Sequence, residues 1–198
     1  EEARAKGIRI LTGSAVIEVR GSKRVTAARV AAIDVKAHAV TSPGEWLDCD
    51  LVASSGGYSP VVHLASHLGG KPVWREDILG FVPGEAPQKR VCVGGINGVY
   101  ALGDSLADGF EGGVRAAAEA GFQTVEGVLP KALSRLEEPT LALFQVPHEK
   151  NSARAPKQFV DFQNDVTAGG IELATREGFE SVEHVKRYTA LGFGTDQG

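Results

Sequence analysis

Residues 49–64 read CDLVASSGGYSPVVHL, and they decide the fold class that we expect for this chain. The apolar run that ends at Ser54 is typical of a buried strand, and a helical pattern over 61–68 follows the glycines. Glycine has no Cβ, so a glycine turn between a strand and a helix lets backbone amides approach a phosphate closely. The stretch therefore predicts an α/β fold with a nucleotide-contacting turn at Ser55, Gly56 and Gly57.

A second junction of the same kind follows about forty residues later, where RVCV at 90–93 precedes GGING at 94–98. We expect a buried strand at 90–93 and an amphipathic, alanine-rich helix that runs to about Val125. The stretch between the junctions, 71–90, has the prolines, glycines and charges of a loop. The second junction adds four candidate nucleotide contacts, which are Gly94, Gly95, Asn97 and Gly98.

Residues before the first junction carry the alternating pattern of short antiparallel strands. The run over 8–19 is broken by Gly13 and predicts two strands and a turn. Further strands are expected at 25–35, 37–40 and 46–54. Together they predict an antiparallel meander ahead of the glycine turns.

Composition narrows the class of protein. The chain has 198 residues, 42% of them apolar and 23% charged, with a net charge of −4. These values fit a globular protein with a real core and argue against a nucleic-acid partner. The sequence shows no 18-residue apolar run and no secretory signal, so we expect no membrane contact and a cytoplasmic location. It contains no methionine, which suggests a piece of a longer chain.

Two junctions after a meander resemble the two-dinucleotide-binding-domain flavoproteins, which have a glutathione-reductase-like fold. More specifically, 49–64 and the string LADG at 106–109 resemble the alpha subunit of heterotetrameric sarcosine oxidase. FVDFQNDVT at 159–167 and REGFESVEHVKRYT at 176–189 strengthen that resemblance, which covers essentially the whole chain. The chain is accordingly identified as similar to an internal part of such a subunit.

The resemblance implies an oxidoreductase complex that oxidatively demethylates sarcosine to glycine. It implies NAD on the alpha subunit, with FAD as the alternative ligand, whereas folate, FAD and FMN are expected only elsewhere in the complex. The expected partners are the beta, gamma and delta subunits. No catalytic residue is expected within this chain, so the isolated segment should be inactive. The alternative is a structural or docking module of an amine or opine dehydrogenase complex, with a vestigial nucleotide site.

The resemblance also divides the chain into four parts. We expect the end of a nicotinamide-type dinucleotide domain at 1–90, the C-terminal part of a flavin-type domain at 91–128, a linker arm at 129–156, and a small helical domain at 157–198. The last part resembles the BFD-like iron–sulfur domain of related dehydrogenases. Its helices are expected over Thr167–Glu177 and Ser181–Tyr188, with Thr167 and Ser181 as N-caps.

The cysteine positions of that iron–sulfur domain fall on Asp161, Gln163 and Asp196 in this sequence. Cluster iron needs thiolates, so we expect no iron–sulfur cluster and no other metal. Apolar packing should hold the helices instead, and the expected contacts are Phe162, Val166, Ile171, Leu173, Val182, Val185 and Tyr188.

VYALGD at 99–104 offers a second register for the later junction. It would place the Asp104 carboxylate where flavoproteins of this kind bind the ribityl chain of FAD. In the first register Asp104 is a helix residue and Gly95 takes that place, which weakens an FAD site and leaves room for NAD. Residues 91–93 make the better buried strand and favour the first register, but both stay open.

Overall fold

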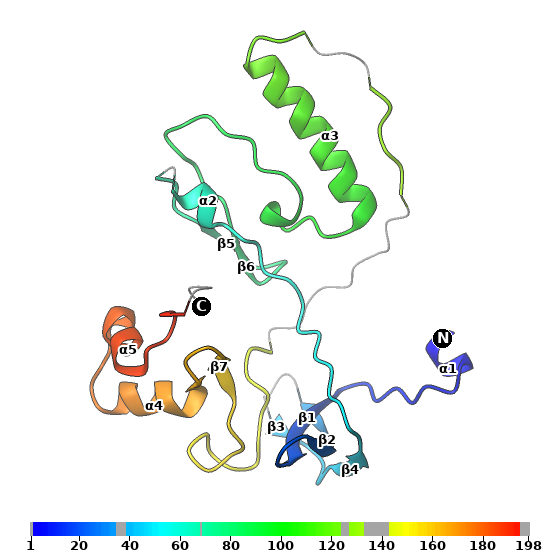
Figure 1. Cartoon of the computed structure of the whole chain (residues 1–198), viewed down its shortest axis with the longest axis vertical. Helices are drawn as coiled ribbons and strands as arrows, with labels where there is room; N and C mark the ends of the chain where they lie inside the picture. Colours follow the sequence, from blue (N-terminus) through cyan, green and yellow to red (C-terminus); the bar gives the residue numbers. More distant parts are fainter. Residues whose placement is uncertain (1, 35–38, 68, 124–126, 133–142, 195–198) are drawn as a thin grey trace. The chain divides into compact units, whose positions relative to one another are not determined.

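The computed structural model describes residues 2–34, 39–67, 69–123, 127–132 and 143–194 (Figure 1). The chain divides into two compact units. Unit 1 combines residues 1–53 with 143–198, and unit 2 consists of residues 54–142. Sequence-distant segments thus build unit 1. The four-part domain assignment rests on family resemblance and stays a prediction.

The N-terminal half of unit 1 is a small antiparallel sheet that follows a short helix, α1 (Glu2–Ala5). Its strands are β1 (Ser14–Gly21), β2 (Val25–Asp34), β3 (Ala39–Val40) and β4 (Glu45–Asp48). β2 pairs with β1, β3 and β4, always antiparallel. The predicted meander is therefore confirmed for these strands, while Val35 and 37–38 lie outside the described residues.

Small residues let this sheet form around β2. Ala27, Ala28 and Ala31 are buried together with Ile17 of β1. At the hairpin between β1 and β2, Gly21 has φ 145°, and a Cβ there would overlap the Arg24 carbonyl oxygen. Any residue other than glycine would strain this turn.

Two strand predictions in this region are wrong. Residues 8–11 form no strand, and β4 ends at Asp48, so 51–54 is not a strand either. Both stretches are exposed, and no described strand pairs with them. An apolar run becomes a parallel strand only when neighbouring strands supply its hydrogen bonds and cover its two faces.

The C-terminal half of unit 1 is a hairpin followed by two helices. β7 (Phe159–Asp161) pairs with β8 (Val166–Thr167), and α4 (Ala168–Arg176) and α5 (Val182–Thr189) follow. The Thr167 hydroxyl accepts a hydrogen bond from Gly170 N at 3.1 Å, as expected of an N-cap. Ser181 occupies the N-cap position of α5 without a side-chain hydrogen bond. Both predicted helices are confirmed, and the hairpin was missed.

The apolar packing of this half agrees with the prediction at Val166 of β8, which is buried, and differs from it elsewhere. Ala174 of α4, which was not predicted, is fully buried. Phe162 and Val182 are 81% and 78% exposed, so they do not hold the helices together in this chain. A small residue at the centre lets α4 lie close to its neighbours.

Unit 2 contains α2 (His63–Ser66), the hairpin of β5 (Val73–Arg75) and β6 (Gly80–Val82), the 3₁₀ turn η1 (Gly94–Asn97), and α3 (Leu102–Glu119). The long helix is confirmed but ends at Glu119, and Val125 lies outside the described residues. The hairpin stands where a loop was predicted. Residues 90–93 are not a strand, again because no described strand pairs with them.

The coarse prediction of a mixed α/β protein holds. Within the described ranges, no helix is both long and apolar enough to cross a bilayer.

Candidate functional site

The glycine turn at 94–98 is well defined by its own hydrogen bonds. Gly94 and Gly98 have φ values of 69° and 75°, and Gly98 N and Val99 N donate to the carbonyls of Gly95 and Gly94. The Asn97 side chain donates to Cys92 O at 2.5 Å. These bonds fix a left-handed conformation at both ends of η1, which only glycine adopts readily.

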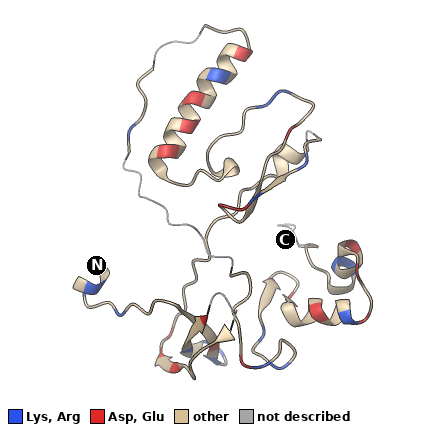
Figure 2. Ribbon diagram, turned by 180° about the vertical axis from the view of Figure 1, so that it is seen from behind, with Lys and Arg blue, Asp and Glu red and all other residues tan. Residues whose placement is uncertain are grey.

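α3 is fastened to this turn by Asp108. Its carboxylate accepts a hydrogen bond from Gly94 N at 2.6 Å. The helix carries Asp104, Asp108, Glu111 and Glu119 against Arg115, and Figure 2 shows this acidic character along its length. A backbone amide that already binds a carboxylate, beside an acidic helix, cannot serve a phosphate. The acceptor beside the turn is the Asp108 carboxylate of α3.

Glycine also sets the distance between α3 and the segment before the turn. A Cβ at Gly112 would overlap Val93 Cγ1 and lie 3.2 Å from Val91 Cγ1. The helix therefore lies directly against 91–93, which keeps Asp108 within reach of Gly94.

Arg75 of β5 supports the turn from its other end. Its guanidinium donates to Asn97 O at 2.8 Å and to both carboxylate oxygens of Asp77. The hydrogen bond from Arg75 lowers the pKa of Asp77, and the same bond raises the pKa of Arg75. The predicted loop thus contributes a charged pair to the candidate site.

The first glycine stretch, Ser55–Gly57, is exposed and belongs to neither a helix nor a strand. Gly57 has φ 100°, and a Cβ at Gly56 or Gly57 would meet nothing within 4 Å. The strand expected before it is not formed, and α2 behind it has four residues, too few for an anion site at its N-terminus. The local geometry of a phosphate cradle is therefore not present here, although the backbone is open to a ligand.

The two glycine stretches of unit 2 meet through a pair of tyrosines. Tyr58 follows Gly57 and Tyr100 comes two residues after Gly98, and their ring centroids lie 5.2 Å apart at an interplanar angle of 31°. Tyr58 is 77% exposed. Sequence reasoning placed both stretches at one site, and the ring contact links them.

Asp161 forms a separate polar centre in unit 1. It is 4% exposed, and its carboxylate accepts four hydrogen bonds, from Gln163 N, Asn164 N, Asn164 Nδ2 and Gly192 N. These bonds, the one from the Asn164 side chain above all, lower the pKa of Asp161. A Cβ at Gly194 would overlap the Gln163 side chain. Two of the predicted cysteine positions thus contact 192–194, while Asp196 lies outside the described residues.

Sequence reasoning missed three contributors to the unit 2 site: Asp108, Arg75 and the tyrosine pair. Asp108 had a usable signal, since an acid in the second turn of a helix can reach back to a preceding glycine turn. Arg75 had none, because its hairpin was read as loop. Within the described residues, no group of three or more His, Cys, Asp or Glu side chains is arranged to hold a metal, and Cys49 and Cys92 are free thiols.

Comparisons with known proteins agree with the resemblance read from the sequence. Residues 155–198 match the family described as "Sarcosine oxidase A3 domain". The whole chain is 33% identical over 199 residues to sarcosine oxidase subunit alpha of Corynebacterium sp. (strain P-1) and covers 20% of it. The subunit alpha of Rhizobium meliloti (strain 1021) is 38% identical over 157 residues, which are 78% of this chain and 15% of that one.

A solved structure is similar over the full chain. The crystal structure of L-proline dehydrogenase from P. horikoshii matches with a TM-score of 0.63 and 19% identity, over 100% of this chain and 38% of that one. At this identity the match concerns the fold alone. The chain spans about a fifth of the length of the first two curated relatives it matches.

Proposed function

Because the chain is a homologue of a region of the sarcosine oxidase alpha subunits, we propose that it is part of an amine-oxidising subunit and helps to bind a dinucleotide. The observation that carries the proposal is the linked arrangement in unit 2. There the glycine turn at 94–98 is fastened to α3 by Asp108 and linked to the stretch after Gly57 by the Tyr58–Tyr100 contact. Ser55, Gly56, Gly57, Gly94, Gly95, Asn97 and Gly98 remain the proposed contacts.

The residues fit the sugar part of a dinucleotide better than its pyrophosphate. Gly94 N already donates to Asp108, and the acidic side chains of α3 would repel a phosphate. A carboxylate with a second oxygen can accept a hydrogen bond from a ribose or ribityl hydroxyl. The open backbone at Gly56 and Gly57 lets a ligand approach without meeting a side chain. We therefore place the sugar hydroxyls of NAD, or of FAD as the alternative, beside Asp108.

When bound, such a dinucleotide supplies hydride or electron transfer chemistry. The chain's own contribution is to position it. Asp108 accepts a hydrogen bond, and Gly56, Gly57 and Gly94 leave the Cβ position open for close approach, whereas Ile78 fills that position at Gly98. The exposed face of Tyr58 offers an aromatic surface. No residue in this set is proposed as catalytic.

For the whole protein, we propose oxidative demethylation of sarcosine to glycine in a complex with beta, gamma and delta subunits, located in the cytoplasm. Folate, FAD and FMN would be bound elsewhere in that complex. The chain by itself should produce no hydrogen peroxide from sarcosine. Peroxide production by the purified 198-residue chain would refute this part.

We also propose that residues 157–198 bind no iron–sulfur cluster. The Asp161 carboxylate is buried and its oxygens already accept hydrogen bonds from four N–H groups, so they are not available to a metal. Oxygen donors are also poor ligands for cluster iron. An iron and acid-labile sulfide assay on anaerobically purified protein tests this, and a stoichiometric cluster would contradict it.

A second function has its own support. The chain would be a docking module of an amine or opine dehydrogenase complex, with a vestigial nucleotide site. Two observations favour this docking function. Gly94 N is already used in a hydrogen bond to Asp108, and residues 51–54 do not form the strand expected before Ser55.

One experiment separates the two. The full-length subunit is purified with its partners, and the nucleotides released on denaturation are identified and counted. About one dinucleotide per subunit supports the binding function, and none supports the docking function.

A further inference from the structure

The hairpin of β5 and β6 contacts both glycine stretches of unit 2, although none of its residues is among the proposed dinucleotide contacts. A Cβ at Gly80 would lie 3.0 Å from Pro60 Cδ, so the hairpin packs against the residues that follow Gly57. A Cβ at Gly98 would overlap Ile78 Cδ1, so the turn of the same hairpin packs against the end of the second stretch. One element thus supports both stretches.

Arg75, the last residue of β5, makes the polar contact between this hairpin and the second stretch. Its Nη1 donates to Asn97 O at 2.8 Å, and its Nε donates to Asp77 Oδ1 at 3.0 Å. Its Nη2 donates to the other carboxylate oxygen of Asp77. The guanidinium is planar and its N–H groups point in fixed directions, so the contact with Asp77 sets the direction in which Nη1 donates. Asp77 therefore directs Arg75 toward Asn97 O.

Tyr100 lies within electrostatic reach of the same guanidinium. The hydrogen bond with Asp77 is the main cause that raises the pKa of Arg75, and Tyr100 adds to it in the same direction. The Tyr100 ring also contacts the ring of Tyr58, which follows Gly57, at 5.2 Å between centroids. Arg75 therefore lies where the hairpin, the turn at 94–98 and the tyrosine pair come together.

The backbone group that Arg75 binds belongs to the peptide between Asn97 and Gly98. The N–H of that peptide donates to Gly95 O at 3.1 Å, and its C=O accepts from Arg75. A glycine after a turn peptide tolerates more than one orientation of that peptide, as the difference between type I and type II turns shows. The bond from Arg75 stabilises the orientation in which the C=O points toward the hairpin.

We propose that Arg75 is a positioning residue for the dinucleotide: it fixes the orientation of the Asn97–Gly98 peptide and, with it, two of the proposed ligand contacts. The inference rests on the proposed function, because this orientation matters to a ligand only if the dinucleotide binds at the second stretch. Arg75 is not placed against the ligand itself. The two-point contact with Asp77 balances its charge, which leaves it poorly suited to attract a phosphate.

Two substitutions of Arg75 test this role in the full-length subunit. Arg75→Ala removes the guanidinium, and Arg75→Lys keeps a positive charge but lacks the planar fork that reaches Asp77 and Asn97 O together. Each should weaken dinucleotide binding about tenfold, the effect of one lost charge-assisted hydrogen bond. Titration calorimetry of the nucleotide-depleted subunit measures the dissociation constant, at a temperature well below the unfolding midpoint of each variant.

Arg9→Lys is the matched control, because Arg9 forms the same kind of two-point pair, with Glu45 in unit 1. It should leave dinucleotide affinity unchanged. The unfolding midpoint separates a positioning role from a purely structural one. A residue that only stabilised the fold would lower the midpoint in Arg75→Lys and leave the dissociation constant of the folded protein as in wild type. That result would overturn the inference.

A double-mutant cycle tests whether Asp77 acts through Arg75. Asp77→Asn loosens the guanidinium and should weaken dinucleotide binding about threefold on its own. Added to Arg75→Ala, it should cause no further loss, because the group that it directs is already gone. Losses that simply multiply would show that Asp77 acts on binding without Arg75, which contradicts the proposed arrangement.

Gly56→Val distinguishes a failure of this inference from a failure of the proposed function. If Gly56→Val loses the dinucleotide while both Arg75 variants bind it like wild type, the site stands and the inference is wrong. If the wild-type subunit binds no dinucleotide, the proposed function is wrong and the inference fails with it. A loss in Gly56→Val and in both Arg75 variants, with Arg9→Lys unchanged, is the expected result.

Discussion

Residues 157–194 of unit 1 and the glycine stretches of unit 2 were both predicted from short strings of sequence, yet they fared differently. In the C-terminal segment, both helices formed where their caps and periodicity placed them. In unit 2, the turn at 94–98 and α3 formed, but the strands expected before each glycine stretch did not.

The difference lies in where the stabilising partners come from. Helix hydrogen bonds and caps are supplied within a few residues, as with Thr167 and Gly170. A parallel strand needs neighbouring strands, and the described residues provide none for 51–54 or 90–93. Local sequence signals therefore predict an element well only when its hydrogen-bond partners lie within a few residues of it.

The packing of α3 is expected to be the most sensitive part of unit 2. Gly112→Ala should destabilise by about 1–3 kcal/mol, because the new methyl overlaps Val93. Gly113→Ala is the matched control, since a Cβ there meets nothing within 4 Å. It should stabilise by about 0.5–1 kcal/mol through helix propensity. Denaturant unfolding of both variants measures this, and equal effects would show that α3 does not lie against 91–93.

In the C-terminal segment, Asp161→Asn should cause the largest loss of stability among the aspartate-to-asparagine changes there. The folded-state pKa of Asp161 lies below that of an unfolded aspartate, about 3.9, so its contribution is complete above that pH and disappears as pH falls through the folded pKa. Unfolding midpoints from pH 7 to pH 2 should therefore converge for wild type and variant.

Asp165→Asn serves as the control for that series. Asp165 has φ 53°, a conformation that asparagine adopts readily. Because Asp165 is exposed, Asp165→Asn should change the unfolding midpoint at pH 7 much less than Asp161→Asn does. A constant gap between wild type and Asp161→Asn down to pH 2 would show that the Asp161 carboxylate does not carry the stabilisation.

Substitutions of two aspartates on α3 test which register, 91–98 or 99–104, forms the second junction. Asp108→Ala should lower dinucleotide affinity about tenfold, the effect of one charge-assisted hydrogen bond. Asp104→Asn should leave affinity unchanged if 91–98 is the junction. Titration calorimetry of the nucleotide-depleted full-length subunit measures both. The reverse pattern would make 99–104 the junction and Asp104 the ligand contact.

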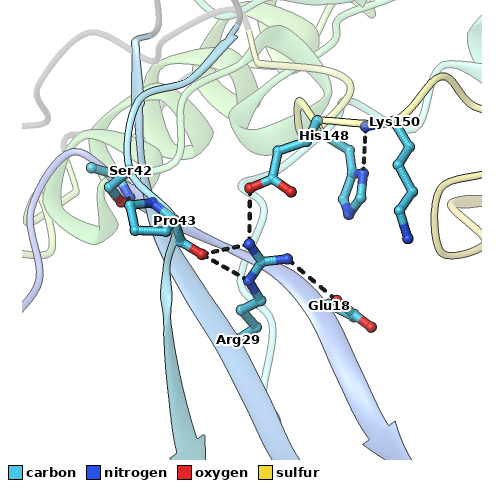
Figure 3. Close-up of polar contacts among 8 residues, drawn as sticks. Glu18, Arg29, Ser42, Pro43, His148 and Lys150 are labelled. Carbon is cyan, nitrogen blue, oxygen red and sulfur yellow. Dashed lines mark hydrogen bonds and ion pairs between the residues drawn. The ribbon is translucent and has the colours of Figure 1, made fainter.

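Small effects are expected at two ion pairs near the surface, of which the Arg29–Glu149 pair ties the chain near 149 to the sheet (Figure 3). Glu149→Gln should cost about 0.2–1 kcal/mol, because the Glu149 side chain is 44% exposed and solvent screens the pair. The Arg9–Glu45 pair is more exposed still, so Glu45→Gln should give no measurable change in the unfolding midpoint. A larger loss of stability in Glu45→Gln than in Glu149→Gln would contradict this order.

The sequence was sufficient for the meander at β1–β3, for α3 and for the C-terminal helices, because alternation, helical periodicity and caps are local. It was insufficient for the hairpin of Trp74 and Phe81, whose T-shaped ring contact at 5.1 Å joins residues in a stretch dominated by loop signals. In the candidate site, the glycines were identifiable, but their partners were not. The Asp108–Gly94 bond spans 14 residues and depends on how closely α3 approaches, which Gly112 sets.

Nucleotide content is the measurement that bears on whether the glycine stretches bind a dinucleotide. Full-length wild type, Gly56→Val and Gly113→Val are purified with their partner subunits, and bound nucleotide is released and quantified. A Cβ at either glycine would meet no other atom within 4 Å, so the first side-chain carbon of each valine is accommodated. We predict about one dinucleotide per subunit in wild type and Gly113→Val, and a loss of about tenfold or more in Gly56→Val, where the side chain blocks backbone approach. Equal nucleotide content in all three proteins would contradict the proposed site.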